Sequence, residues 1–389
     1  MAFQIALSML LVVGAGLFVR TMMGLNAVDT GFNPNHLVLF EIQPPVARYA
    51  GVKDVVRLHD RLKQRIEALP GVESVSLAQT AYIADNMENS DFLPEGEGFA
   101  QDSRQGKPGA ELFNVVGANF FKTMEIPMVA GRCFGAQATA TSPKVAIINQ
   151  ALARKRFPGM NPIGKRFKAD RDAGSPRIEI VGICANTRYA SLLTAPPAQF
   201  FLPYVQDSGV RGMVYEVRTR TSPAALAPAL RQVVQSIDPD LPIVDLRTQR
   251  EQIDATLQVQ RALAALTASF GLLALALACV GIYGVMAYSV VQRTSEIGIR
   301  LALGAHPVQV RGMIFRESTW IAGVGIVAGL ATALVLTRLV RSMLFGNGPY
   351  DPATMTSCTV LLLAIALAAS WLPARRAAGI QPMEALRHE

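Results

Sequence analysis

Charged residues are scarce in this chain, and the scarcity is local. Of its 389 residues 17% are charged, against about 25% in an average soluble protein. Residues 1–19 contain no Lys, Arg, Asp or Glu, and residues 262–389 contain nine Arg, five acidic residues and no Lys. Residues 20–261 hold the remaining 28 basic and 24 acidic residues, which is an ordinary soluble composition. A single soluble globular domain is therefore excluded, as are collagen-like, disulfide-scaffold and disordered chains.

Long runs of like charge are also missing, although the formal net charge is +8. Within 20–261 the basic residues are interleaved with nearly as many acidic ones, and the arginines of 262–389 border apolar segments. A nucleic-acid-binding surface needs basic residues gathered on one face. The sequence therefore predicts no nucleic-acid partner.

Motifs for catalysis or metal binding are absent from the sequence. The four histidines have no paired spacing, and no nucleophile-elbow or zinc-protease pattern occurs. The stretch 159–166 nearly matches a phosphate-binding loop, but Arg166 replaces the hydroxyl residue that binds magnesium. Pro162 also removes one of the N–H groups that would bind phosphate. We therefore expect no enzymatic activity, no metal site and no cofactor bound by this chain.

Four apolar segments reach the length of roughly 20 residues that a membrane-spanning helix needs. They cover residues 2–19, 262–292, 318–337 and 353–374. The first segment has no basic residues before it and is longer than the apolar core of a signal peptide. We therefore interpret it as an uncleaved anchor rather than a cleaved signal.

Glycines inside two of these segments are typical of close helix packing. Gly325-x-x-x-Gly329 has the spacing of small residues that lets two helices approach each other. The surrounding residues 323–328 imitate a dinucleotide-binding fingerprint, but they lie within an apolar helix and not between a strand and a helix. We predict helix-packing roles for Gly281, Gly284, Gly325 and Gly329.

The distribution of arginine predicts the orientation of the chain. The loop 293–317 and the tail after residue 374 together contain seven Arg, whereas the loop 338–352 contains two. Because short cytoplasmic loops are rich in basic residues, the loop 293–317 and the C-terminus are expected in the cytoplasm. Residues 20–261 are then expected outside it.

Two of the four cysteines, Cys133 and Cys184, belong to this external segment. In an oxidising compartment they are compatible with a disulfide, and equally with two separate thiols. Cys279 and Cys358 lie in apolar segments, where we interpret them as small apolar residues.

The second apolar segment is longer than a bilayer requires. As a helix, 262–292 reaches about 45 Å, against about 30 Å for the hydrocarbon core. The preceding residues 251–261 contain no Gly or Pro. We therefore predict one helix that continues out of the membrane as a stalk and transmits motion. The alternative is a tilted helix with a frayed end.

The external segment repeats the order strand, helix, strand at its two ends. Two such β-α-β units flanking a long insertion predict a split ferredoxin-like α+β domain with an inserted subdomain. The clearest strands of the insertion, roughly 80–205, are 145–149 and 178–183. The expected flanking elements are 36–43, 53–69 and 72–79 in the first unit, and 212–219, 223–237 and 242–246 in the second.

The loop that follows residue 292 has the pattern of a docking element. Ser295 can cap a short helix with Glu296 in its first turn, and Glu296 is spaced to pair with Arg300. Ile297 and Ile299 are too apolar for a loop that contacts only water. A short helix that binds a partner protein is one interpretation, and a helix lying on the membrane surface is the other.

These features resemble the MacB-like and FtsX-like permeases of ABC transporters over essentially the whole chain. The most specific motifs are Gly281-Ile-Tyr-Gly284, the run Glu296-Ile-Gly-Ile-Arg-Leu-Ala-Leu-Gly-Ala305, and Pro382-Met-Glu-Ala-Leu386. The external segment adds Val145-Ala-Ile-Ile-Asn149 and Phe157-Pro-Gly. The chain looks especially similar to one half of the duplicated permeases common in acidobacteria.

The resemblance implies an α-helical membrane protein with four transmembrane helices and an α+β extracytoplasmic domain. The first transmembrane helix would cover 1–19, a MacB-like periplasmic core domain 20–261, and an FtsX-like permease domain 262–389. The expected location is the bacterial cytoplasmic (inner) membrane, with the large domain outside the cytoplasm.

The resemblance also implies partners and a function. A cytoplasmic ABC ATPase would bind ATP, and its movement would reach the external domain through the stalk, as mechanotransmission for export or efflux. The other partners implied are a second permease copy or paired half, a periplasmic adaptor and the lipid bilayer.

The alternatives are a regulator of a periplasmic cell-wall hydrolase and a membrane-anchored binding or sensor protein. The sequence does not indicate the substrate. The residues expected to contact the ATPase or shape the loop are Arg293, Glu296, Ile297, Gly298, Arg300, Ala302 and Gly304.

The substitution Glu296→Arg tests this docking role. Reversing the charge in the first turn of the docking helix is expected to uncouple ATP hydrolysis from external work without affecting folding. The measurement is substrate transport at a membrane expression level equal to that of the unaltered chain. Transport that remains normal in this variant contradicts the docking role.

Overall fold

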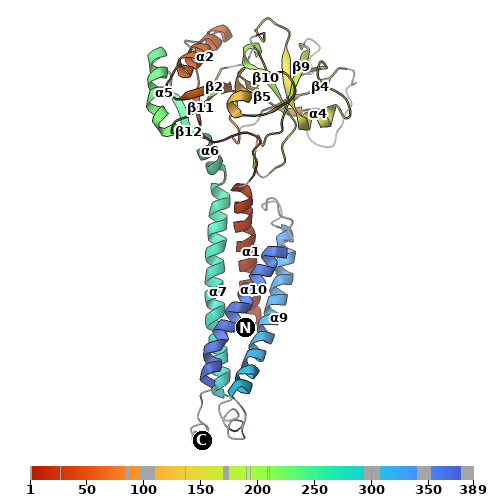
Figure 1. The fold of residues 1–389 in the computed structure, drawn as a ribbon, viewed down its shortest axis with the longest axis vertical. Coiled ribbons are helices and arrows are strands. Elements are labelled where there is room, and N and C mark those ends of the chain that lie inside the picture. The colour runs from red at the N-terminus through yellow and green to blue at the C-terminus, as the bar shows by residue number, and fades with distance from the viewer. Residues whose placement is uncertain are drawn as a thin grey trace. The chain divides into compact units, whose positions relative to one another are not determined.

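The computed structural model divides into two compact units (Figure 1). The β-rich unit is Val28–Leu257, and the helical unit combines Met1–Ala27 with Gln258–Glu389. The residues that the structure describes are 2–26, 28–84, 88–95, 110–135, 137–169, 175–189, 191–192, 194–207, 209, 211–292, 299, 307–339 and 352–377.

The β-rich unit begins and ends with the two expected β-α-β segments. Their strands join one sheet in the order β12-β1-β11-β2, with antiparallel neighbours throughout. The two segments therefore interleave, because β11 of the second lies between β1 and β2 of the first. The elements are β1 (Leu37–Ile42), α2 (Val52–Glu67), β2 (Val72–Ala78), β11 (Met213–Thr219), α5 (Pro223–Ile237) and β12 (Ile243–Thr248).

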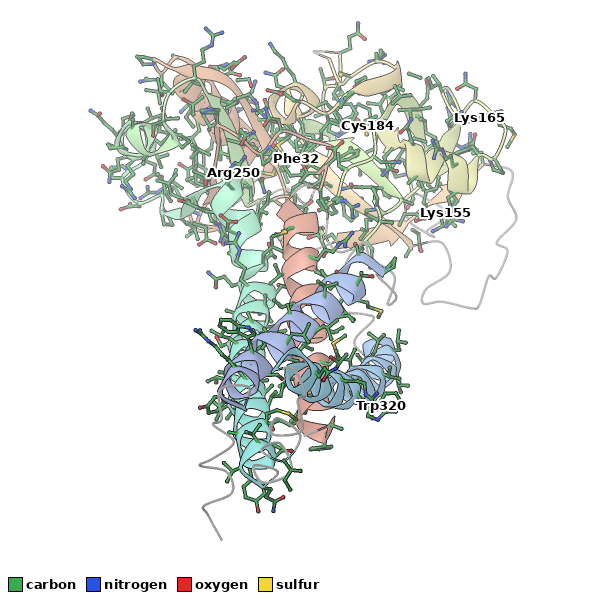
Figure 2. All side chains as sticks on the ribbon, turned by 60° about the horizontal axis from the view of Figure 1, so that its bottom comes forward. Phe32, Lys155, Lys165, Cys184, Arg250 and Trp320 are labelled. Atoms are coloured by element: carbon green, nitrogen blue, oxygen red, sulfur yellow. The ribbon has the colours of Figure 1, made fainter. Side chains whose placement is uncertain are left out.

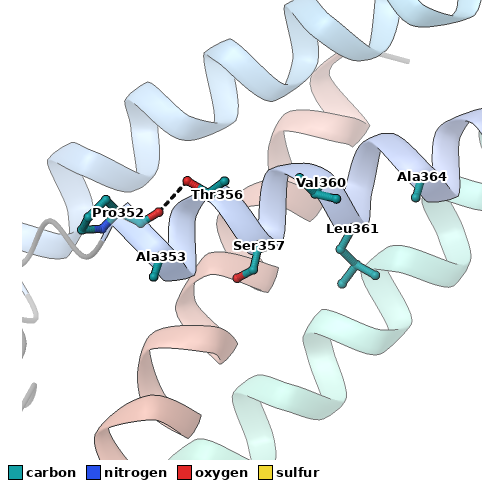
Figure 3. A pocket seen from close by; sticks show the side chains of 7 residues that line it. All are labelled: Pro352, Ala353, Thr356, Ser357, Val360, Leu361 and Ala364. Atoms are coloured by element: carbon teal, nitrogen blue, oxygen red, sulfur yellow. Dashed lines mark hydrogen bonds between the residues drawn. The ribbon is translucent and has the colours of Figure 1, made fainter.

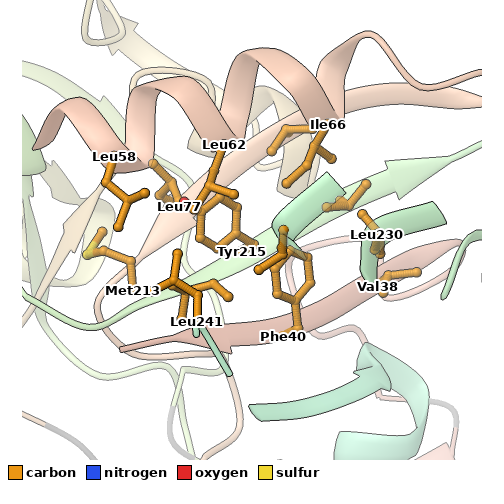
Figure 4. Close-up of a cluster of buried hydrophobic side chains, with 14 of the residues drawn as sticks. Val38, Phe40, Leu58, Leu62, Ile66, Leu77, Met213, Tyr215, Leu230 and Leu241 are labelled. Atoms are coloured by element: carbon orange, nitrogen blue, oxygen red, sulfur yellow. The ribbon is translucent and has the colours of Figure 1, made fainter. Parts of the chain in front are cut away.

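Helices α2 and α5 bury their apolar faces against this sheet (Figure 4). The faces consist of residues four apart on each helix, which lie on one side because a turn takes 3.6 residues. Side chains alternate along the strands, so every second residue points to the opposite face of the sheet. The main contacts come from Leu58, Leu62 and Ile66 of α2, Leu226, Leu230 and Val234 of α5, and Val38, Phe40 and Tyr215 of the strands.

The insertion between these segments forms its own apolar core but shares the sheet. Its strands continue the order as β5-β10-β7-β9-β8-β4, with β3 on β5 and β6 on β9. The connection to the first four strands is the pair Ala78↔Val116 between β2 and β5. The elements are β3 (Glu88–Asp91), β4 (Leu93–Pro94), β5 (Ala110–Val116), α3 (Phe120–Met124), β6 (Met128–Gly131), β7 (Val145–Asn149), α4 (Gln150–Arg156), β8 (Arg166–Lys168), β9 (Ile178–Cys184), β10 (Gln199–Pro203) and the 3₁₀ turn η1 (Tyr204–Gln206).

The helical unit contains α1 (Ala2–Asn26), α7 (Gln258–Gln292), α9 (Pro307–Leu339) and α10 (Pro352–Ala377). Helix α1 packs against the other three, so the two ends of the chain share one apolar core. Among the described residues, three helical stretches are long and apolar enough to cross a membrane: Ala2–Thr21, Gln258–Gln292 and Pro352–Trp371. The predicted segment 318–337 corresponds to a shorter apolar stretch, Ala322–Leu336.

The predicted single stalk helix is interrupted at one residue, Leu257. Helix α6 (Gln249–Thr256) ends before Leu257, and α7 begins after it, so no unbroken helix runs from residue 251 to 292. At this point the hydroxyl of Thr256 donates to the carbonyls of Gln252 and Ile253, and the amide of Leu257 donates to the carbonyl of Ile253 at 3.3 Å. Helix α7 itself has 35 residues, which is about 52 Å and well beyond a bilayer core of about 30 Å.

His59 is a buried polar residue of α2 within the apolar core. Its Nδ1 lies 2.8 Å from the Tyr215 hydroxyl and its Nε2 lies 2.9 Å from the carbonyl of Arg211. Since a carbonyl only accepts, Nε2 carries the proton and Nδ1 accepts from Tyr215. Burial lowers the pKa of His59 below its ordinary value of 6.5.

This shift predicts that the β-rich unit loses stability in acid. Below about pH 6.5 the unfolded chain binds a proton at His59 that the folded chain does not yet bind, so the free energy of unfolding falls by up to about 1.4 kcal/mol per pH unit. In His59→Gln that part of the pH dependence is expected to vanish. Pulse proteolysis of the full chain in urea, at about pH 7.5 and about pH 5.5, measures it. An equal acid loss in both proteins contradicts the prediction.

Candidate functional site

The residues predicted to contact an ATPase lie outside the described part of the chain. They are Arg293, Glu296, Ile297, Gly298, Arg300, Ala302 and Gly304. Within this stretch the structure describes Ile299, which is helical and has 47% of its surface exposed. The docking role of the loop therefore stays a prediction.

Helix α9 approaches α1 most closely at two glycines. A Cβ atom on Gly325 would lie 2.7 Å from Cβ of Ile5 and 2.9 Å from the carbonyl oxygen of Ala2. On Gly329 it would lie 2.7 Å from the Ala6 carbonyl oxygen and from Cβ of Met9. These distances are too short for any larger residue, so the two glycines set the separation of the helices.

Helix α7 meets α1 through polar groups as well as a glycine. Gln4 Nε2 donates to the carbonyl of Leu277 at 2.7 Å, and the Ser8 hydroxyl lies 3.0 Å from the carbonyl of Ala274. A Cβ atom on Gly281 would collide with the amide of Gln4. Gly284 has open space in the described structure, so a packing role for it stays a prediction.

A shallow hollow on α10 is part of the helix surface and not an enclosed cavity. Its lining residues all come from that one helix (Figure 3). They are mostly apolar, and among them Val360 and Leu361 are exposed at 61% and 45%. Such a surface suits lipid or another apolar helix better than a polar small molecule.

The stretch 159–166, which resembles a phosphate-binding loop in sequence, uses several of its backbone amides in hydrogen bonds within the protein. The amide of Gly164 donates to the carbonyl of Ile180 at 2.8 Å, and that of Lys165 donates to the carbonyl of Pro162 at 3.0 Å. The amide of Ile163 donates to the side chain of Asn161. A phosphate would need these groups to be available, so the stretch is a turn between α4 and β8.

The two cysteines of the β-rich unit are separate thiols in the structure. Cys133 is exposed and Cys184, labelled in Figure 2, is buried. Burial raises the pKa of both, most strongly that of Cys184, so neither is an activated thiolate. Among the described residues, no group of three His, Cys, Asp or Glu is placed to hold a metal ion.

Glu216 of β11 is a buried carboxyl group on the sheet face away from α2. Both of its oxygens lack a hydrogen-bond partner among the described residues. Burial raises the pKa of Glu216 well above its usual range, and nearby Arg218 only partly opposes this. Burial therefore disfavours the charged form of this carboxyl group.

A set of contacts that the sequence analysis missed surrounds α6. The side chains of Gln249 and Gln252 are buried and donate to the backbone of the loop after β2. Arg250 donates to Asn35 in the linker between α1 and β1. The capping box of Thr248 and Glu251, which fixes the start of α6, is the one signal in the sequence that could have drawn attention to this helix.

The substitution Gly325→Leu tests the α1–α9 contact. The added side chain has no space beside Ile5, so we expect a destabilisation of about 1–3 kcal/mol. The matched control is Gly323→Leu on the same helix, because an added Cβ there has open space among the described residues. Thermal unfolding of both variants in detergent measures the difference, and equal melting temperatures contradict the predicted contact.

Comparisons with known proteins identify relatives along most of the chain. Residues 2–233 match the family described as MacB-like periplasmic core domain, and residues 268–382 match FtsX-like permease C-terminal. A macrolide export ATP-binding/permease protein MacB of Agrobacterium fabrum is 27% identical over 291 residues, which are 70% of this chain and 43% of that protein. The pyoverdine export ATP-binding/permease protein PvdT of Pseudomonas putida is 27% identical over 298 residues, 72% of this chain and 44% of that protein.

One solved structure that the chain matches is the periplasmic region of MacB from Actinobacillus actinomycetemcomitans. It covers 60% of this chain and 98% of its own, with 11% identity and a TM-score of 0.39. The chain spans less than half the length of the two curated relatives named above. Since the periplasmic core match alone covers more than half of the residues, the chain belongs to the family of permeases that carry a MacB-like periplasmic core domain and an FtsX-like permease C-terminal domain.

Proposed function

We propose that this chain is the permease subunit of an ABC-type exporter. In this proposal a separate cytoplasmic ATPase hydrolyses ATP, and the chain converts that reaction into movement of its β-rich unit outside the cytoplasm. The names of the relatives combine an ATP-binding part with a permease part. The families that this chain matches are the periplasmic core and permease families, over residues 2–233 and 268–382, which supports the permease assignment.

The observation that carries the proposal is how the chain connects its units. A β-rich unit of ordinary soluble composition is inserted between α1 and α7 of an apolar helical unit. A permease that works by mechanotransmission needs such an external body joined to membrane helices at both of its ends. Helix α7, longer than a bilayer is thick, is suited to carry movement between them.

The proposal includes a membrane topology and a fold. We interpret α1, α7, α9 and α10 as four spans of the inner membrane, with the loop after α7 in the cytoplasm. The strand order β12-β1-β11-β2, with α2 and α5 on one face, supports a split ferredoxin-like unit into which residues 80–205 are inserted.

The proposed partners follow from the same assignment. They are the ATPase at the loop 293–305, a second copy or paired half of the permease, the lipid around the helices and a periplasmic adaptor. The relatives are described as exporters of macrolides and pyoverdine. Export is therefore the function we propose, without assigning a substrate.

Photo-crosslinking from residue 302 tests the ATPase contact. Ala302→Cys, combined with Cys133→Ser to remove the exposed native thiol, is labelled with a photoreactive maleimide in native membranes. The trapped protein is then identified by mass spectrometry. We expect an ABC ATPase subunit.

The matched control is the chain that keeps Ala302 and is labelled at native Cys133. Cys133 lies in the β-rich unit, so its label is expected to trap no ATPase. Lipid adducts alone at residue 302 contradict the proposal, because they indicate that the loop lies on the membrane and favour a binding or sensor protein.

A further inference from the structure

Helix α6 holds the loop 79–84 through two buried amides. Gln249 Nε2 donates to the carbonyl of Tyr82 at 3.1 Å, and Gln252 Nε2 donates to the carbonyl of Ile83 at 2.8 Å. Among the described residues, the Oε1 atoms of both glutamines are buried without a partner. A leucine would fill a similar volume without leaving a buried acceptor, so filling the core does not explain these amides.

The same helix contacts the linker 28–36, which follows α1 in the chain. Arg250 Nε donates to Asn35 Oδ1 at 2.6 Å. The ring of Phe32 in this linker stacks on the ring of Tyr82, with 5.0 Å between centroids. Figure 2 labels Phe32 and Arg250. The segment that follows α1 and the helix that precedes α7 are therefore joined to each other and to one loop.

The loop 79–84, where the insertion begins, is in turn bound to the segment that follows β9. The Thr187 hydroxyl donates to the Tyr82 hydroxyl at 3.1 Å, and the amide of Ile83 donates to the carbonyl of Tyr189 at 2.7 Å. The rings of Tyr82 and Tyr189 meet edge to face at 5.1 Å. Thr187 and Tyr189 follow β9 directly, so the loop lies between α6 and the core of the insertion.

The backbone of Ile83 is held in an unfavourable conformation. Its φ is +57°, in the left-handed region that a β-branched residue rarely adopts. Both of its backbone polar groups are used there, the amide by Tyr189 and the carbonyl by Gln252. Such a conformation persists only while its neighbours enforce it, so loss of the Gln252 contact releases the loop.

We propose that Gln249, Arg250 and Gln252 of α6 are the coupling contact through which displacement at the membrane ends of the β-rich unit reaches the insertion. Displacement of α6 pulls on the carbonyls of Tyr82 and Ile83, and these residues pull on Thr187 and Tyr189. The three side chains are positioning residues that act through the loop 79–84 and bind no substrate. This inference rests on the proposed function, and it adds the path of movement inside the β-rich unit.

The test compares movement of the insertion in the complete complex, with and without ATP. Spin labels are placed at native Cys133, in the insertion, and at Arg57→Cys on the exposed face of α2. Cys279 and Cys358 are replaced by Ala in all variants. The distance between the labels is measured in nanodiscs for the chain bound to its ATPase, before and after addition of ATP, and the rate of ATP hydrolysis is measured in parallel.

The coupling variant is Gln249→Leu combined with Gln252→Leu, and the matched control is Gln235→Leu on the exposed side of α5. We expect the coupling variant to hydrolyse ATP at the rate of the unaltered complex and to lose the ATP-dependent change in distance. The control is expected to keep both. A coupling variant that keeps the full change in distance overturns the inference and leaves the proposed function intact.

Absence of any ATP-dependent change in the unaltered complex is a different result, because it contradicts the movement in the proposed function itself. Should the double variant not fold, Arg250→Ala and Tyr82→Phe decide the question. Each removes one hydrogen bond of the path and keeps the apolar packing. Both are expected to reduce the ATP-dependent change in distance, and an unreduced change in both overturns the inference.

Discussion

The structure depends on one constraint of connectivity: the chain passes between its two units after Ala27 and again after Leu257. Any force that passes along the chain from the helical unit to the β-rich unit acts at these two points. The hydrogen bond from Arg250 to Asn35 joins the segment that follows Ala27 to the segment that precedes Leu257. Because the two segments are bound to each other, they cannot be displaced independently without breaking a contact inside the β-rich unit. In the function we propose, relative movement of α1 and α7 acts on this contact.

The helical unit achieves its packing by close approach. In lipid there is little gain from burying one apolar helix against another, so association depends on shape and on hydrogen bonds. Gly325 and Gly329 let α9 approach the backbone of α1, and Gln4 and Ser8 of α1 bond to carbonyls of α7. Helix α1 therefore holds the C-terminal helices together, although it is separated from them by more than 200 residues of sequence.

Buried polar groups in the β-rich unit fall into two kinds. His59 has a partner at each ring nitrogen, which fixes its tautomer and the register of α2 on the sheet. Gln249, Gln252 and Glu216 keep acceptors without partners among the described residues, at a cost in stability. Costly arrangements of this kind are expected where a structure must change rather than only persist. The three residues lie on β11 and α6, away from the apolar core that α2 and α5 cover.

Patterns among neighbouring residues were sufficient to predict most of the individual helices and strands and the class of protein. Apolar length predicted the helices around 2–19, 262–292 and 353–374, and alternation and helical periodicity predicted β7, α5 and α2 within one or two residues. Motifs such as Gly281-Ile-Tyr-Gly284 predicted the family, since they require no knowledge of the fold. These are signals carried by neighbouring residues, which a single chain displays directly.

The contacts between distant segments could be found only in the folded chain. Nothing in the local pattern indicates that β11 lies between β1 and β2, or that Gly325 lies against Ile5. The break at Leu257 was not predicted, because residues 251–261 contain no Gly or Pro that would mark it. The amides of Gln249 and Gln252 look like ordinary exposed residues of a polar helix. Their role becomes visible only when folding places the carbonyls of Tyr82 and Ile83 beside them, because a hydrogen bond is fixed by distance in space and not by spacing in the sequence.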